Sequence, residues 1–128
     1  MTGRVVHFEV PYDDADRART FYAEVFGWAI QPVPEFDYNF VQTGPVGQDG
    51  MASEPGYIGG GMFRRQPPVG QPVITIQVDD INAALASIAQ RGGATVREPE
   101  AVGDMGMAAY FTDSEGNLMG LWQSLGGA

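Results

Sequence analysis

Hydrophobic and polar residues alternate near the start of the chain, over Val5–Val10. A period of two from Val6 onward is typical of a half-buried strand, and it places Val6, Phe8 and Val10 on one face and His7 and Glu9 on the other. Acidic residues follow, which favour a helix N-terminus, and apolar residues then recur at helical spacing. This helix face comprises Ala18, Phe21, Tyr22, Val25 and Phe26. Gly27 is suited to end the helix in a left-handed conformation.

The same pattern returns in the second half. Val73–Val78 alternates like the first strand, and Asp79 and Asp80 precede a second helical face of Ile81, Ala84, Leu85 and Ile88, which Gly92 and Gly93 close. The differences Asp80 minus Asp14, Gly93 minus Gly27 and Val73 minus His7 are all 66. A constant offset over strand, cap and stop indicates an internal repeat.

Each predicted helix precedes three predicted strands. We expect them at 28–33, 36–43 and 57–64 in the first half and at 94–97, 107–112 and 117–123 in the second. Residues 113–116 read as a hairpin turn, and 66–71 as a stiff connector. The segment 47–56 is either a mobile flap or a plain surface loop. We therefore expect one domain, 1–128, built from modules at about 4–65 and 72–125.

Composition narrows the functional classes. The 128 residues include no Cys, which excludes disulfides, thiolate zinc sites and a cysteine nucleophile. The net charge is −9 and all seven basic residues are Arg, so nucleic acid and anionic membranes are disfavoured as partners. A cationic or neutral small molecule fits this charge better, unless the charge serves solubility alone. With no signal peptide or apolar span recognisable, we expect a cytoplasmic protein.

The duplicated strand–helix–three-strand unit resembles the vicinal oxygen chelate superfamily, which includes glyoxalase I, extradiol dioxygenases and bleomycin-resistance proteins. The resemblance rests on HFEVPYDDADRARTFY at 7–22, Phe26-Gly27-Trp28, ITIQVDDINAALASIAQRGG at 74–93 and the turn at 113–117. It implies an α+β fold in which two βαβββ modules form a cup-shaped half-barrel, with helices outside and the ligand inside. It also implies a homodimer.

Enzymes of this superfamily usually hold a divalent metal with one residue from the first and last strand of each module. Of these positions, only His7 matches a metal ligand in this chain. The other first-strand position falls on Val73, and the last-strand positions fall near Gly120 and within 59–62. Catalytic metals usually keep about three protein ligands, so we expect no cofactor, with a divalent metal at His7 as the alternative.

The remaining candidate residues surround these positions. His7 is the only His, and with Glu9 it is the first candidate for acid–base catalysis without a metal. Residues on the expected inner wall are candidates for ligand binding: Thr75, Gln77, Tyr38, Leu118, Gly120 and Trp122. Glycine at position 120 would enlarge the site and make it less polar, which suits a flat organic molecule stacked on Trp122.

Two functions follow from these residues. The first is a small-molecule binding protein without the metal, comparable to the resistance proteins. The second is a glyoxalase-like lyase, isomerase or dioxygenase with a displaced metal or with His7 and Glu9 as acid–base groups. The sequence leaves open whether the chain is an enzyme, and a partner domain without chemistry is a third interpretation.

Overall fold

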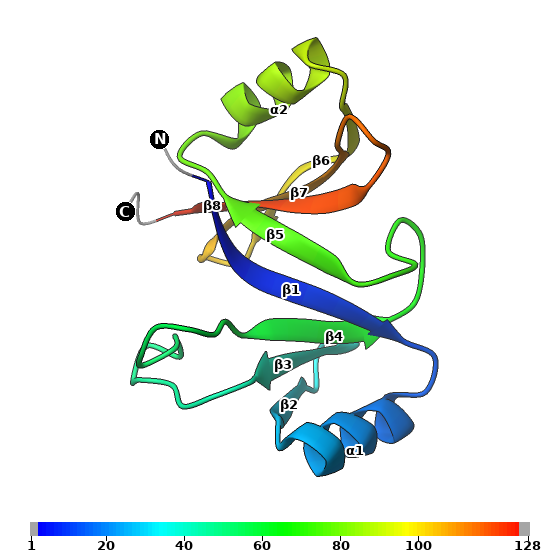
Figure 1. Cartoon of the computed structure of the whole chain (residues 1–128), viewed down its shortest axis with the longest axis vertical. Coiled ribbons are helices and arrows are strands. Elements are labelled where there is room, and N and C mark those ends of the chain that lie inside the picture. The colour runs from blue at the N-terminus through cyan, green and yellow to red at the C-terminus, as the bar shows by residue number, and fades with distance from the viewer. Residues whose placement is uncertain (1–2, 126–128) are drawn as a thin grey trace. The chain divides into compact units, whose positions relative to one another are not determined.

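A computed structural model of the chain describes residues 3–125 (Figure 1). Its elements, in order, are β1 (Arg4–Tyr12), α1 (Ala15–Phe26), β2 (Ala29–Val33), β3 (Tyr38–Gln42), β4 (Gly60–Arg64), β5 (Val73–Gln77), α2 (Ile81–Gln90), β6 (Ala94–Val102), β7 (Gly106–Thr112) and β8 (Leu118–Ser124). They form two compact units, which we call module one (residues 7–72) and module two (3–6 and 73–125). Both contain a helix followed by three strands, so the predicted α+β class with two βαβββ modules is confirmed.

Local signals place both helices where the sequence predicts them. The Asp14 carboxylate accepts a hydrogen bond of 3.0 Å from the backbone N–H of Arg17, and Asp80 accepts one of 3.0 Å from Ala83. These caps satisfy N–H groups that have no partner within the helix. Gly27 ends α1 at φ 74°, a left-handed conformation that glycine adopts without a Cβ penalty.

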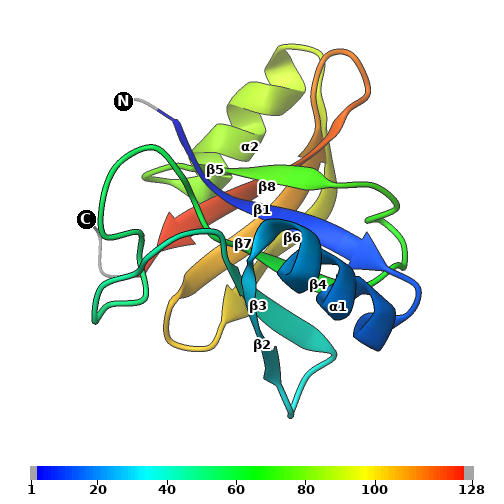
Figure 2. The same ribbon diagram turned by 60° about the horizontal axis from the view of Figure 1, so that its bottom comes forward.

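Module one contains a four-stranded sheet in the order β2-β3-β4-β1. β1 and β4 are parallel, and the other neighbours are antiparallel. α1 lies on one face of this sheet (Figure 2). The core between helix and sheet contains Tyr12, Val41 and Met62, with Phe8, Val10, Tyr22, Trp28 and Ile30 packed against it. Because side chains alternate along β1, His7 and Glu9 lie on the opposite face.

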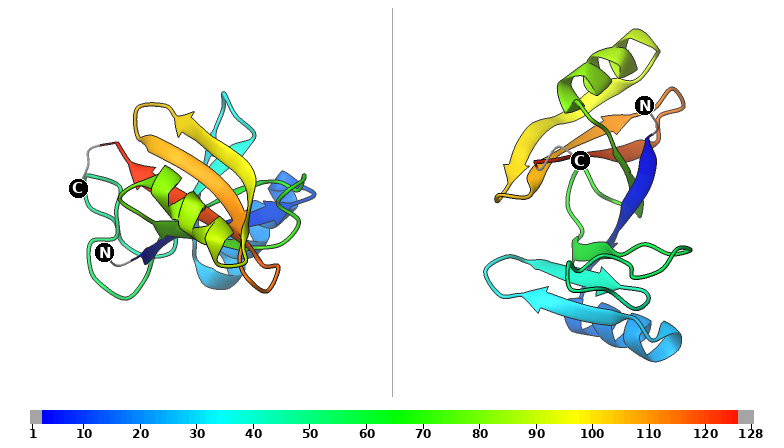
Figure 3. Two further views of the ribbon diagram at one scale, coloured as in Figure 1. Left: turned by 90° about the horizontal axis from the view of Figure 1, so that it is seen from above. Right: turned by 90° about the vertical axis from the view of Figure 1, so that its left-hand side faces the viewer.

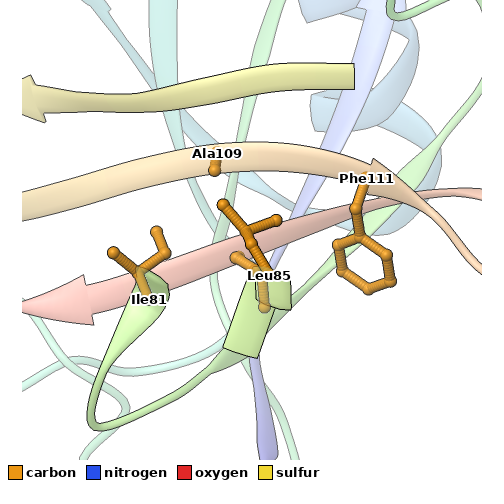
Figure 4. Close-up of a cluster of buried hydrophobic side chains, with 5 residues drawn as sticks. Ile81, Leu85, Ala109 and Phe111 are labelled. Atoms are coloured by element: carbon orange, nitrogen blue, oxygen red, sulfur yellow. The ribbon is translucent and has the colours of Figure 1, made fainter. Parts of the chain in front are cut away.

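Module two repeats this arrangement with β5-β8-β7-β6, in which only β5 and β8 are parallel. α2 lies along one face of the sheet (Figure 3). The buried cluster beneath it consists of Ile81, Leu85, Ala109, Phe111 and Leu121 (Figure 4). The residues between these along β7 and β8 therefore lie on the face without a helix.

Several predicted strand ends are wrong. Phe36 lies in a turn, and β3 begins only at Tyr38. β4 begins at Gly60 rather than at 57, because Tyr57 instead donates a hydrogen bond of 2.6 Å to the carbonyl of Pro45. β6 continues past 97 to Val102, with irregular register against β7 on both sides of Arg97. Such bulges break the alternation from which a strand is read.

The segment between β3 and β4 is held by its own hydrogen bonds. Val46 and Ala52 form a bridge, and the Ser53 N–H donates to the Pro45 carbonyl at 3.1 Å. The Thr43 hydroxyl donates to the carbonyl of Ile58 at 2.7 Å, which joins the two ends of the segment. These contacts are those of a compact surface loop.

Candidate ligand-binding faces

Each module has one sheet face without a helix, which we call its polar face. In module one this face carries His7 and Glu9 from β1, Tyr38 and Phe40 from β3, and Gly61 from β4. In module two it carries five of the predicted ligand-binding residues: Thr75, Gln77, Leu118, Gly120 and Trp122. Alternation along each strand places these residues on one face within each module.

His7 and Tyr38 form a polar pair on module one. The Nε2 atom of His7 lies 3.2 Å from the Tyr38 hydroxyl. The Tyr38 ring stacks on Phe63, with centroids 6.0 Å apart, and meets Phe40 edge-on at 5.5 Å. The aromatic neighbours hold the ring in place.

Burial sets the protonation of this pair. It disfavours the charged form of an imidazole and lowers the pKa of His7 below 6.5. Burial, and secondarily the negative charge of Glu9, raise the pKa of Tyr38 well above 10. At neutral pH the pair is therefore an uncharged imidazole and a protonated phenol. It can donate and accept hydrogen bonds, and a neutral imidazole can also accept a proton.

Gly61 makes the position of Tyr38 possible. A Cβ atom built on Gly61 would lie 1.9 Å from the Tyr38 hydroxyl oxygen and 2.4 Å from its Cζ atom. The Tyr38 ring thus lies across β4 directly over Gly61, and its hydroxyl contacts His7. Among the twenty residues only glycine leaves that space free.

Paired residues across the strands form equivalent rows on the two polar faces. In module one the row is Glu9, Gly61, Phe40 and Gln31 on β1, β4, β3 and β2. In module two it is Thr75, Gly120, Tyr110 and Arg97 on β5, β8, β7 and β6. Both rows have glycine on the last strand of the module, which is where the superfamily's second ligand of each module is expected.

Gly120 is covered in the same manner as Gly61. A Cβ atom at Gly120 would lie 2.7 Å from Oγ1 of Thr75, and Thr75 itself is only 8% exposed. A hydroxyl group from a neighbouring strand thus lies over the last-strand glycine of each module. Val73 is the third of the superfamily's ligand positions that has no metal-ligating side chain here, and it is buried and apolar.

Trp122 lies one row further along β8, opposite Gln77. Its ring covers Gly106, where a Cβ atom would approach the indole to 2.8 Å. The indole N–H donates to the hydroxyl of Ser124 at 3.2 Å, so its polar edge is satisfied within the strand. The ring is half-buried and presents apolar surface on this face.

The side chains of the polar faces do not fit the superfamily's metal. Over residues 3–125 there is no group of three or more His, Asp or Glu side chains placed to hold a metal ion. His7 is the one matching position, and its imidazole nitrogen contacts the Tyr38 hydroxyl.

Sequence reasoning missed two members of the module-two row. Tyr110 lies within the predicted strand 107–112 and Arg97 at the end of the predicted strand 94–97, and neither is among the predicted ligand-binding residues. The internal repeat could have indicated Arg97, because the positions of Gln31 and Arg97 differ by 66, the same offset that relates the two modules. The register of β6 supplies the missing link, since Arg97 lies opposite Tyr110.

The single histidine gives a direct test of the burial of this pair. The pKa of His7 in the folded chain is expected below 6.5, because burial penalises the imidazolium. The unfolded chain then binds the proton more readily, so stability should decrease as pH falls through 6.5 and level off below the folded pKa. NMR titration of the ring protons measures the pKa, and His7→Gln should remove this pH dependence. A folded pKa at or above 6.5 would contradict it.

Comparisons with known proteins agree with this arrangement. The family model of the bleomycin resistance protein-like N-terminal region matches residues 4–44. "Putative glyoxylase CFP32" of Mycobacterium tuberculosis is 31% identical over 118 residues, which are 87% of this chain and 42% of that protein. A glyoxylase-like domain-containing protein of Didymella fabae is 27% identical over 91% of each chain. The chain thus spans less than half the length of the mycobacterial relative.

Solved structures share the fold at low sequence identity. A hypothetical protein from Bacillus halodurans C-125 aligns with a TM-score of 0.65 and 13% identity, over 97% of this chain and 96% of that one. A methylmalonyl-CoA epimerase variant from Streptomyces coelicolor aligns with a TM-score of 0.63 and 18% identity, over 97% and 99%. None of the described helices is both long and apolar enough to cross a membrane. The family model and the sequence relatives place the chain with the vicinal oxygen chelate superfamily, and the solved structures show that it has the same fold.

Proposed function

We propose that this chain is a small-molecule binding protein that lacks the superfamily's usual metal site. The observation that carries the proposal is the pair of covered glycines. A ligand side chain at Gly61 or Gly120 would have to start from a Cβ atom, and the Tyr38 and Thr75 hydroxyls lie 1.9 Å and 2.7 Å from those positions. Hydroxyl groups therefore stand in place of two metal ligands.

The chemistry of the polar faces supports an organic ligand. The Tyr38, Phe40 and Phe63 rings contact one another, and Phe40 is 46% exposed. Exposed aromatic surface beside a few polar groups suits a planar molecule that stacks and forms oriented hydrogen bonds. The uncharged His7–Tyr38 pair provides one such oriented donor and acceptor.

Metal content is the direct test. Tag-free protein is expected to contain well below one divalent metal ion per chain by mass spectrometry, because one imidazole without further ligands holds a metal weakly. His7→Ala should leave that content unchanged. Stoichiometric metal in the wild type that is lost in His7→Ala would overturn the proposal and favour a rebuilt metal centre.

A ligand screen tests the other half of the proposal. Aromatic and heteroaromatic compounds should raise the melting temperature, since a ligand that binds only the folded state stabilises it by mass action. Tyr38→Phe keeps the ring stacking and removes the hydroxyl, so it should weaken ligands that bind through the His7–Tyr38 pair. A screen in which no compound stabilises the protein would oppose the binding function.

One observation favours an enzyme as the second candidate. Burial keeps His7 neutral at physiological pH, and a neutral imidazole can act as a general base. The relatives named glyoxylase make a lyase or isomerase the first reactions to assay. Loss of a detected turnover in His7→Ala and in Glu9→Gln would support this alternative. Unchanged turnover in both would remove it.

Two expectations concern the chain's setting. We propose a homodimer, because β2 and β6 are edge strands, and an exposed edge can pair with that of a second copy across a two-fold axis. Sedimentation at several concentrations tests this proposal, and a monomer at all of them would contradict it. We also propose a cytoplasmic location, which cell fractionation would test.

A further inference from the structure

The two polar rows carry opposite charges. Glu9 opens the row of module one, whereas Thr75 stands at the equivalent place in module two. At the other end, Gln31 of module one corresponds to Arg97 of module two. The module-one row is therefore anionic at one end, and the module-two row is cationic at the other. The chain's net charge of −9 does not show this local difference.

Arg97 is held over an aromatic ring. Its guanidinium carbon lies 5.9 Å from the centroid of the Tyr110 ring, and the two residues are directly paired between β6 and β7. A guanidinium stacked on an aromatic face is attracted by the ring electrons and loses rotamer freedom. The guanidinium N–H groups lie in the plane of the group, so stacking on a ring leaves them able to bind a ligand.

Arg97 forms no ion pair with a carboxylate among residues 3–125. The ion pairs there join Arg19 to Asp16, Arg64 to Asp37 and Arg65 to Asp13, all in module one. Glu100 lies on the same polar face, one row further along and opposite Ala108, yet forms no ion pair with Arg97. The Arg97 guanidinium is exposed and is not held in an ion pair, so it can bind an anion from outside the chain.

Only the outer half of the row is open to the body of a small ligand. Gly120 contributes no side chain, and a Cβ there would lie nearer to Thr75 than to Tyr110. Exposure rises along the row, from Thr75 and Gly120, which are buried, to Tyr110, which is half-buried, and to Arg97, which is exposed. A ligand on this row would therefore lie over Tyr110, with its charged end at Arg97 and the solvent.

We propose that Arg97, positioned by Tyr110, binds the anionic group of a small organic ligand whose uncharged part lies over the half-buried Tyr110. The group is a carboxylate or a phosphate ester, because a planar guanidinium pairs with two oxygens of either. This inference rests on the proposed binding function and names its ligand class. Glu100 on the same face opposes an anion there, whereas exposed charges more than about 8 Å away are largely screened at physiological salt.

The test uses four probes with one ring and different head groups: benzoate, phenyl phosphate, benzyl alcohol and benzylamine. Dissociation constants come from NMR titration of the full chain, with the backbone signals of Gly120 and Tyr110 as the readout. At least one of the two anions should bind about tenfold tighter than benzyl alcohol, a ratio typical of one hydrogen-bonded charge. The better anion identifies the head group, and benzylamine should bind most weakly.

Arg97→Gln should reduce the affinity for the better anion about tenfold and leave that for benzyl alcohol unchanged. Arg97→Lys keeps the charge and loses the planar fork, so it should restore only part of the affinity. Arg91→Gln is the matched control, since Arg91 is exposed at the end of α2 in the same module. It changes the net charge equally and should have no effect.

The outcomes separate this inference from the function on which it rests. If benzyl alcohol binds as well as the anions and Arg97→Gln changes nothing, the anion site is wrong and the binding function stands. Equal losses in Arg91→Gln and Arg97→Gln would also overturn the site, because they indicate a long-range charge effect. If none of the four probes shifts a signal on either polar face, both the inference and the binding function are contradicted.

Discussion

Gly61→Ala is expected to destabilise the protein by about 1–3 kcal/mol, the range for overpacking a filled site. The added methyl group would lie 1.9 Å from the Tyr38 hydroxyl oxygen and 2.4 Å from Cζ. The ring must therefore move away from β4. That movement breaks the contact with His7 and disturbs the stacking on Phe63. Chemical denaturation measures the loss, and the NMR signals of His7 report whether its environment changes.

Two variants separate the steric clash from the general effect of removing a glycine. Gly70→Ala is the control, since a Cβ atom at Gly70 meets nothing within 4 Å, and it should be neutral or slightly stabilising. Tyr38→Ala removes the ring, so Gly61→Ala should be far less harmful in that background. The double-mutant cycle should give a coupling of at least about 1 kcal/mol. Additive effects would mean that Tyr38 does not need Gly61.

The elements that the sequence predicts best are those with local signals. Asp14, Gly27 and Asp80 act within one turn of the helix that they start or end, so no distant residue has to be known. The strand ends depend on partners far along the chain. Phe36 continues an alternating pattern but lies in a turn, because pairing of β3 with β4 begins only at Tyr38. Periodicity alone does not contain that pairing.

The residues of the candidate site show the same difference between local signals and long-range pairing. Alternation on β1 and β5 places His7, Glu9, Thr75 and Gln77 on the faces without helices, and this needs only the period of a strand. The contact between His7 and Tyr38 depends instead on the strand order β3-β4-β1 and on a glycine in the strand between them. A run of glycines in the sequence indicates close approach, but it does not say which side chain uses the space.

The row of module two is difficult to predict from the sequence for a further reason. Arg97 lies between two register irregularities in β6, so the alternation that reveals a face is broken on both sides of it. Tyr110 has the period and size of a core residue, yet its neighbour Phe111 is the one that packs under α2. Pairing across the sheet, rather than the pattern along one strand, brings Thr75, Gly120, Tyr110 and Arg97 together.

Phe111→Ala is expected to cause the largest loss of stability, about 3–5 kcal/mol. Phe111 is 6% exposed and belongs to the cluster that Ile81, Leu85 and Ala109 form under α2 (Figure 4). Removing the ring loses its transfer free energy and leaves a cavity that the helix and sheet close only in part. Since a domain of this kind is stable by about 5–15 kcal/mol, a large part of the total is at stake.

The control for Phe111→Ala is the same substitution at Phe36, which is 70% exposed in its turn. Because the Phe36 ring is mostly in water already, its removal should change stability by no more than about 0.5 kcal/mol. Urea denaturation of both variants gives the comparison. Equal losses at the two positions would mean that the α2 face of module two is not the core, and the polar face opposite it would then have to be assigned anew.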